Sequence, residues 1–401
     1  MKVLIADKFE QVGIDGLKEL GCEVEYHPGV ADDLPAKIKE LDPSVLIVRS
    51  TKVPAAALEA AGRLALIIRA GAGYDTIDVG RASSLGIFVA NCPGKNSIAV
   101  AELVMGLLLC CDRRLPDQTA ELRDGKWNKK EYAKARGLHG RTLGVVGLGQ
   151  IGYEVATRAR AFGMKVVAWS RSLTTEKAES LGLEYAATPL DVARVADAIS
   201  INVAATADTE NLIDRAFIEA MKPDAYLINT SRGSVIDEDA LRDGIRNKGL
   251  RAGLDVYKNE PPAAGKEFSN PIVHEPGVYG THHVGASTDQ AQVAIAHETL
   301  RIVESFLESG EVPNCVNRLA RSSATHVLSV RHRNRPGVLA HVFHVLADHS
   351  INVEEVENII YHGAEATCAR VHIDDAPPNG AIDQIRSGND NIISVSLAAL
   401  D

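Results

Sequence analysis

A turn of three glycines stands between an apolar run and an amphipathic run in residues 142–163. In the letters GVVGLGQIG, residues 144–152, Gly147, Gly149 and Gly152 follow the pattern G-x-G-x-x-G. Such glycines allow a tight turn, a close approach of the backbone to a pyrophosphate, and close packing of a helix on a strand. The amides at the N-terminus of the following helix favour negative charge. The pattern predicts a dinucleotide-binding domain, built as a parallel sheet with helices on both faces.

The residue that usually binds the adenosine ribose is replaced in this sequence. An acidic side chain is typical about 20 positions after the glycine turn; Ser170 and Arg171 stand there instead. An acid would repel a 2′-phosphate, whereas an arginine fork suits one. Two interpretations stay open: Arg171 binds the phosphate of NADP, or Arg171 lies in solvent and the site takes NAD.

Short Val/Ile-rich runs alternate with helical patterns over two stretches of the chain. Five strands are expected in residues 1–97 and six in residues 142–285. The predicted class is α/β, with two doubly wound parallel-sheet domains. Residues 1–97 and 285–315 would form one discontinuous, substrate-binding domain around the dinucleotide-binding domain, residues 98–284. Long helices at 97–115 and 288–309 would bridge the two domains across a cleft.

The pattern changes after a polar linker near residues 308–323. Residues 322–401 predict strand (325–332), helix (336–349), strand (352–360), strand (366–373), helix (378–387) and strand (392–399). That order, βαββαβ, is typical of a ferredoxin-like domain.

Composition excludes several classes of protein. A net charge of −10 argues against nucleic acid or an anionic membrane as a partner. The six cysteines are scattered and no ligand cluster is evident, which favours a reduced, cytoplasmic protein without a metal. The N-terminus reads as a first strand and not as a signal peptide, and the longest apolar run is too short for a membrane span.

Charged residues follow three successive strands of the second sheet. Arg232 follows the first of these strands, Asp255 and Glu260 the second, and His282 and His283 the last. Since ligands bind at the carboxyl ends of parallel strands, these side chains are expected to meet. A histidine can take the hydroxyl proton when an alcohol is oxidised by hydride transfer, a carboxylate can stabilise the imidazolium, and an arginine can hold a substrate carboxylate. Surface roles for each residue, and a metal held by the histidine pair, are the weaker alternatives.

Four motifs, GLGQIG, NTSRGSVIDEDAL, DVYKNEPP and THHVGAST, occur in the order and spacing of a known family. The sequence thereby resembles the D-isomer-specific 2-hydroxyacid dehydrogenases. The resemblance implies that Arg232 binds substrate, that Glu260 partners the histidine, and that His283 is the acid/base. It also implies substrate contacts from the backbone near Ala72 and Gly73 and from Asn96. The implied cofactor contacts are Gly147, Gly149, Gln150, Ile151, Gly152, Ser170, Arg171, Thr230, Ser231, Arg232, Asp255, His283, Gly285 and Ala286.

Two arginines favour a phosphorylated substrate. Arg49 and Arg69 end strands of the first domain, opposite the expected catalytic residues, where a substrate phosphate would need cations. Together with these arginines, the resemblance implies hydride transfer between NAD(P) and C2 of 3-phosphoglycerate, in serine synthesis. Reduction of glyoxylate or hydroxypyruvate is the alternative within the family, and a non-catalytic nucleotide-sensing protein is the alternative outside it.

The last 80 residues resemble the small-molecule regulatory domain called ACT. The stretch HRNRPG, residues 332–337, matches a serine-binding pattern, and Asn352 matches a second serine-binding position. The resemblance implies that His332, Asn334 and Asn352 bind L-serine across a pair of these domains, in a homodimer or homotetramer. The alternative is a domain that only assembles subunits.

Overall fold

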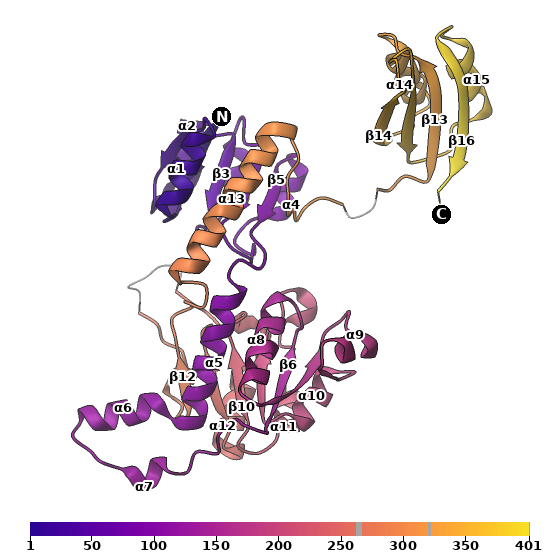
Figure 1. Ribbon diagram of the computed structural model, residues 1–401. Helices are drawn as coiled ribbons and strands as arrows, with labels where there is room; N and C mark the ends of the chain where they lie inside the picture. Colours follow the sequence, from indigo (N-terminus) through magenta and orange to yellow (C-terminus); the bar gives the residue numbers. More distant parts are fainter. Residues whose placement is uncertain (262–266, 320–321, 401) are drawn as a thin grey trace. The chain divides into compact units, whose positions relative to one another are not determined.

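The computed structural model describes residues 1–261, 267–319 and 322–400. The chain forms two compact units, Met1–Asn317 and Arg318–Asp401, which contain three sheets (Figure 1). In the described part of the chain, no helix has the length and apolar character needed to cross a membrane.

The first sheet has five parallel strands in the order β2-β1-β3-β4-β5, the order of flavodoxin-like doubly wound sheets. Its strands are β1 (Lys2–Ile5), β2 (Glu23–Tyr26), β3 (Val45–Val48), β4 (Leu66–Arg69) and β5 (Phe88–Asn91). Helices α1 (Gln11–Glu19) and α13 (Asp289–Ser309) lie side by side on one face, where Leu17 and Ile302 are fully buried (Figure 1). The other face is covered by η1 (Val30–Asp33), α2 (Leu34–Leu41), α3 (Ala55–Glu59) and α4 (Val79–Ser84).

The second sheet has seven parallel strands in the order β12-β11-β10-β9-β6-β7-β8. They are β6 (Thr142–Val146), β7 (Lys165–Trp169), β8 (Glu184–Tyr185), β9 (Ala198–Ile201), β10 (Tyr226–Asn229), β11 (Arg251–Leu254) and β12 (Val278–Gly280). The sequence predicted six of these strands and missed β8. This edge strand has two residues, both exposed, so no apolar run marks it.

Helices cover both faces of the second sheet. One face packs against α5 (Ser97–Arg113) and α8 (Gln150–Ala161), and the other against α10 (Pro189–Val195), α11 (Arg215–Ala220) and α12 (Glu238–Lys248). The remaining elements are α6 (Leu115–Arg123), α7 (Lys129–Tyr132), α9 (Thr175–Ser180), η2 (Ala207–Thr209), η3 (Gly233–Val235) and η4 (Pro271–His274). The chain enters this sheet through α5, directly after β5, and α13 returns to the first sheet. The predicted boundaries between the two domains of this unit stay a prediction.

The second unit is a four-stranded antiparallel sheet in the order β14-β15-β13-β16. Its elements are β13 (His326–Arg333), α14 (Val338–Asp348), β14 (Val353–Ile360), β15 (Ala366–Ile373), α15 (Asn379–Ser387) and β16 (Ile392–Ala399). Both helices pack on the face that carries Leu328, Val330 and Val371. The predicted ferredoxin-like arrangement and the α/β class are therefore confirmed.

Candidate active site

In the glycine turn between β6 and α8, Gly147 and Gly152 each have a steric reason to be glycine. Gly147 has a φ of +96°, and a Cβ there would lie 2.8 Å from the backbone of Asn202. A Cβ on Gly152 would overlap the Gly147 carbonyl, whereas the space beside Gly149 is open. In the described chain no side chain caps α8, so the amides that begin at Gln150 are available to an anion. The turn fits a dinucleotide pyrophosphate.

Arg171, which follows β7, is highly exposed. Its side chain is 78% exposed, and Nη1 lies 4.0 Å from Oδ2 of Asp208, which is itself 82% exposed. An ion pair this exposed contributes little free energy, so the guanidinium can exchange Asp208 for a phosphate at small cost. The roles of Ser170 and Arg171 in choosing between NAD and NADP stay predictions.

The turn after β10 carries Arg232, and buried Asn229 fixes its shape. Asn229 accepts hydrogen bonds from the Ser231 amide (3.0 Å) and hydroxyl (2.8 Å), and its own amide donates to the Arg232 carbonyl (3.0 Å). The Arg232 guanidinium reaches Asp75 in the loop after β4, with Nη2 2.9 Å from Oδ1. Sequence analysis found neither Asn229 nor Asp75. The signal for Asn229 was its place at the end of a strand, directly before Thr230-Ser231-Arg232.

Asp255 organises the loop that carries the histidines. Its carboxylate is buried and accepts hydrogen bonds from the Thr281 hydroxyl (2.6 Å) and from the amides of Val284 (2.8 Å) and Gly285 (2.9 Å). Its carbonyl accepts from the His283 amide (2.7 Å). The structure thus gives Asp255 a role in positioning this loop, while its predicted contact with the cofactor stays a prediction.

His283 lies against Glu260. Nδ1 of His283 is 2.7 Å from Oε2 of Glu260, and the Tyr257 amide donates to Oε1 (2.9 Å). Burial opposes ionisation of Glu260, but the hydrogen bonds from His283 and Tyr257 outweigh it, so the pKa of Glu260 is lowered. A Glu260 carboxylate at neutral pH favours a proton on Nδ1 and leaves Nε2 to face a substrate. Neighbouring His282 is exposed.

Arg69, which ends a strand of the first sheet, lies near both Arg49 and Arg232. Burial, together with the nearby charges of Arg232 and Arg49, lowers the pKa of Arg69 to about 10, so Arg69 is still a cation at neutral pH. Nη2 of Arg49 is 3.3 Å from the hydroxyl of Ser287, which follows the histidine loop. Asp7 accepts the Arg49 amide (2.6 Å) and was not predicted. The three arginines form a cationic site.

Two buried polar atoms in this region have no hydrogen-bond partner among the described residues. They are Nε of Arg69 and Oδ1 of Asn96. Asn96 is the residue before α5, next to the loop that approaches the glycine turn. Groups of this kind are rare in buried positions and point to a ligand that is absent from the structure. Asn91 donates to the Ala72 carbonyl (2.6 Å), which fixes the predicted substrate loop.

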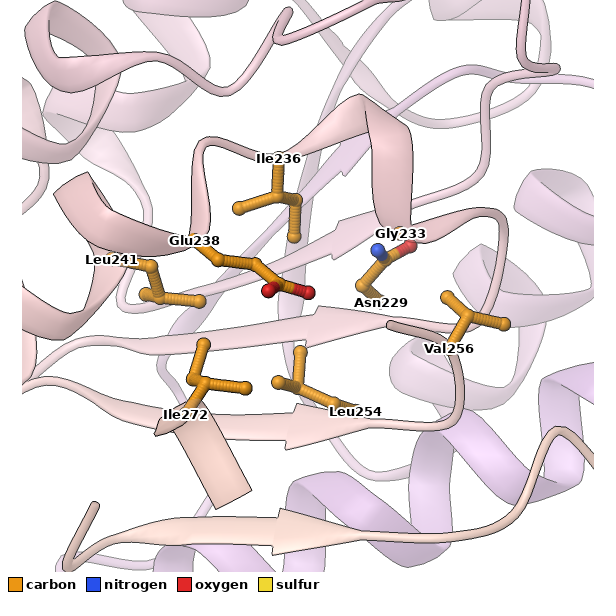
Figure 2. Close-up of a pocket in the computed structure, with 8 residues that line it drawn as sticks. All are labelled: Asn229, Gly233, Ile236, Glu238, Leu241, Leu254, Val256 and Ile272. Atoms are coloured by element: carbon orange, nitrogen blue, oxygen red, sulfur yellow. The ribbon is translucent and has the colours of Figure 1, made fainter. Parts of the chain in front are cut away.

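A small cavity beneath the β10 turn is structural. Figure 2 shows its apolar lining, with the Glu238 side chain reaching into it from α12. Glu238 accepts hydrogen bonds from the Lys258 amide (2.6 Å) and from the side chain of Asn270 (2.8 Å). The carboxylate therefore supports the segment that leads to Glu260. This role of Glu238 was not predicted, and its only sequence signal is the acidic run after Ile236.

Comparison with known proteins agrees with this geometry. Residues 105–285 match the family model described as D-isomer specific 2-hydroxyacid dehydrogenase, NAD binding domain. A hydroxypyruvate reductase of Thermotoga maritima is 43% identical over 282 residues, which are 70% of this chain and 88% of that protein. The chain belongs to the D-isomer-specific 2-hydroxyacid dehydrogenase family.

Other relatives of this chain are named for different substrates. A D-3-phosphoglycerate dehydrogenase of Methanocaldococcus jannaschii is 41% identical over 320 residues, which are 79% of this chain but 59% of that protein. A solved NADPH-dependent glyoxylate/hydroxypyruvate reductase of Sinorhizobium meliloti, in complex with NADP and malonate, is 30% identical with a TM-score of 0.68. That match covers 79% of this chain and 96% of the other. The matched NAD-binding domain, residues 105–285, gives this chain NAD or NADP as its nucleotide.

The second unit contains the ACT domain, matched over residues 326–357. The structure does not bring the three predicted effector residues together within one copy. His332 is 2% exposed, with Nδ1 2.8 Å from the Arg333 carbonyl and Nε2 3.0 Å from Oγ1 of Thr367. Exposed Asn334 lies at the same end of the sheet, where it donates to Ala364 (3.1 Å).

Asn352 lies at the other end of this sheet. Its amide donates to Asp374 (2.8 Å), directly after the end of β15, whereas His332 pairs with Thr367 near the start of β15. Seven residues of extended chain span roughly 20 Å. Any ligand that contacts both Asn334 and Asn352 must therefore lie between two copies of the domain.

The remaining predicted contacts lie on three segments. Ile151 is in the first turn of α8, Thr230 and Ser231 directly follow β10, and Gly285 and Ala286 lie in the loop between β12 and α13. Among residues 1–261, 267–319 and 322–400, no three His, Cys, Asp or Glu side chains gather as ligands of a metal ion.

Proposed function

We propose that this dehydrogenase is a D-3-phosphoglycerate dehydrogenase, which interconverts 3-phosphoglycerate and 3-phosphohydroxypyruvate. The observation that carries the proposal is the hydrogen-bonded pair of His283 and Glu260, beside a group of three arginines. Relatives named D-3-phosphoglycerate dehydrogenase, among them the M. jannaschii protein, support it. Because the match spans 59% of that relative, the activity is a proposal for this chain.

The chain's own residues supply the proton and the binding of charge. The glycine turn and the amides that begin at Gln150 would hold the dinucleotide, whose nicotinamide would supply hydride transfer at C2 in either direction. As the alcohol is oxidised, Nε2 of His283 takes the hydroxyl proton, and the Glu260 carboxylate stabilises the imidazolium through Nδ1. In the reverse direction the same nitrogen protonates the carbonyl oxygen. Arg232 binds the substrate carboxylate and polarises the C2 oxygen.

The cationic site favours a phosphorylated substrate. A carboxylate and a phosphate together carry about three negative charges at neutral pH, which suits Arg49, Arg69 and Arg232. Hydroxypyruvate reduction is the second candidate. The match to the Thermotoga maritima hydroxypyruvate reductase covers 88% of that protein, whereas the match to the M. jannaschii D-3-phosphoglycerate dehydrogenase covers 59%.

A substrate panel separates the two candidates. We expect kcat/KM for 3-phosphohydroxypyruvate to exceed that for hydroxypyruvate and glyoxylate, with NADH or NADPH. Arg69→Gln should reduce kcat/KM for the phosphorylated substrate by at least about tenfold more than for hydroxypyruvate, since a buried charge pair is lost. Equal losses on both substrates, or a wild-type preference for hydroxypyruvate, would assign the reductase activity instead.

The ACT domain is proposed to bind L-serine between two copies, in a homodimer or homotetramer. Asn334 from one copy and Asn352 from the other would hold the ligand, which accounts for their separation within one copy. All six cysteines are free thiols, which favours a reducing compartment such as the cytoplasm.

A further inference from the structure

We propose that Asp75 is a positioning residue for Arg232, and that it turns one fork of the guanidinium toward the substrate. The inference rests on the proposed function, because it concerns how Arg232 binds a 2-keto or 2-hydroxy acid. Asp75 lies in the loop after β4 of the first sheet, and Arg232 follows β10 of the second sheet, 157 residues later.

The five N–H donors of Arg232 divide into two groups. Nε donates to Oδ2 of Asp75 (3.3 Å) and Nη2 to Oδ1 (2.9 Å), which occupies the side of the guanidinium. Nη1 donates to the Ser231 carbonyl (2.8 Å). Because the group is planar, the two remaining donors, one on each Nη, form a fork at its end. That fork suits two oxygens of a 2-keto acid.

The loop around Asp75 is shaped for this contact. A Cβ on Gly73 would overlap Nη2 of Arg232 and would lie 3.0 Å from Oδ1 of Asp75. Glycine at this position lets the guanidinium lie across the backbone that is expected to bind the substrate carboxylate. The negative charge of Asp75 also offsets the repulsion between Arg69 and Arg232, because Arg69 lies close to both Asp75 and Arg232. Burial opposes ionisation of Asp75, but the hydrogen bond and charge of Arg232 lower its pKa, so the pair is charged at neutral pH.

A different role for Asp75 would be that of a competitor, a stand-in carboxylate that the substrate displaces. The donor count favours positioning, because a two-donor fork remains while Asp75 is bound. The two roles predict opposite kinetics. A positioning residue acts mainly on kcat, whereas removal of a competitor lowers KM and leaves kcat intact or higher.

Steady-state kinetics of Asp75→Asn in the full-length protein tests the proposal. We expect kcat for reduction of 3-phosphohydroxypyruvate to fall roughly 10- to 100-fold, as for a misplaced catalytic contact. KM should change less than about threefold, and Asp75→Glu, which keeps the charge, should exceed the Asn variant in kcat by about fivefold or more. Glu59→Gln is the matched control: it removes an exposed carboxylate–arginine pair (Glu59–Arg81, 3.0 Å) from the same sheet's surface and should behave as wild type.

Gly73→Ala provides a second route to the same answer. The added methyl group displaces Arg232 without removing a charge, so kcat should fall while KM is retained. If Asp75→Asn does not fold, this variant decides, and a wild-type kcat for it overturns the proposal. A lowered KM with an intact kcat in Asp75→Asn, or behaviour like that of Glu59→Gln, overturns it as well. An inactive wild type on every 2-keto acid would instead contradict the proposed function.

Discussion

His283 has a backbone conformation that histidine rarely adopts. Its φ is +54°, in the left-handed region, and the strain is held by the hydrogen bond from its amide to the Asp255 carbonyl. The conformation brings Nδ1 to Glu260 while neighbouring His282 stays exposed. A strained residue that neighbouring hydrogen bonds hold in place is typical of a functional site.

Neutralising Glu260 should move the pH profile. Glu260→Gln removes the charge that stabilises the protonated imidazole, so reduction, which needs the imidazolium, should fail at a pH lower by roughly one unit or more. The lowered pKa of Glu260 keeps this carboxylate ionised at neutral pH, so its own titration does not produce the shift. The profile of kcat/KM against pH, recorded in both directions, checks this. An identical profile in the variant would contradict the pairing.

Cofactor preference is tested at Ser170 and Arg171. Ser170→Asp should favour NADH, because it adds a ribose acceptor and repels a 2′-phosphate. Arg171→Ala should reduce kcat/KM for NADPH more than for NADH by about threefold or more, since NADH offers the fork no phosphate. Arg194→Ala, on the surface of α10, removes another exposed ion pair as a control. An unchanged cofactor ratio in Arg171→Ala would mean that this arginine only faces solvent.

At the scale of elements, α13 is tied to the start of α5 and to the segment that follows α13. Glu298 on α13 contacts Arg301, Asn314 (2.7 Å) and Lys95 (3.2 Å), and its side chain is 7% exposed. The hydrogen bond from Arg301, with those from Asn314 and Lys95, outweighs burial and lowers the pKa of Glu298 to about 2. The Glu298 carboxylate thus links the two segments that run between the first and second sheets, the start of α5 and helix α13.

Glu298→Gln should destabilise the first unit in a pH-dependent manner. A depressed pKa contributes stability above the unfolded value near 4.5, and this contribution is lost as pH falls toward about 2. We expect a loss of about 1–3 kcal/mol at pH 7 that shrinks below pH 4.5. Urea unfolding followed by fluorescence of Trp127 and Trp169 measures it. Glu304→Gln, exposed on the same helix, is the control, and an equal loss in both variants at pH 7 would contradict the account.

Sequence analysis succeeded where the information was local. The glycine turn, the strands around it and the order Arg232, Glu260, His283 are readable because each lies at the end of an apolar run. Asp75 was not readable, because its partner is 157 residues away and an exposed loop aspartate has no periodicity. The burial of His332 was missed for a related reason: its position on the inner face of β13 follows from pairing with β15.

At the scale of the whole molecule, the proposed binding of L-serine needs two copies of the ACT domain to meet. Asn334→Ala should abolish inhibition by L-serine while turnover without serine persists, because Asn334 lies in the second unit and the expected catalytic residues lie in the first. His332→Ala is a poorer test, since this residue is buried and its removal breaks its hydrogen bond with Thr367 inside the domain. Inhibition curves for wild type, Asn334→Ala and exposed Asn379→Ala provide the comparison. Retained inhibition in Asn334→Ala would leave the domain an assembly role.

We assign His283, and not its neighbour His282, as the acid/base, and replacing each histidine in turn distinguishes the two. NADH or NADPH oxidation by the full-length protein is measured after addition of 3-phosphohydroxypyruvate, for wild type, His283→Ala and His282→Ala. We expect His283→Ala to lose roughly 10²- to 10⁴-fold in kcat while nucleotide binding persists. The kcat of His282→Ala should stay within about threefold of wild type. A large loss in His282→Ala with an active His283→Ala, or no turnover by wild type on any 2-keto acid, would contradict this assignment.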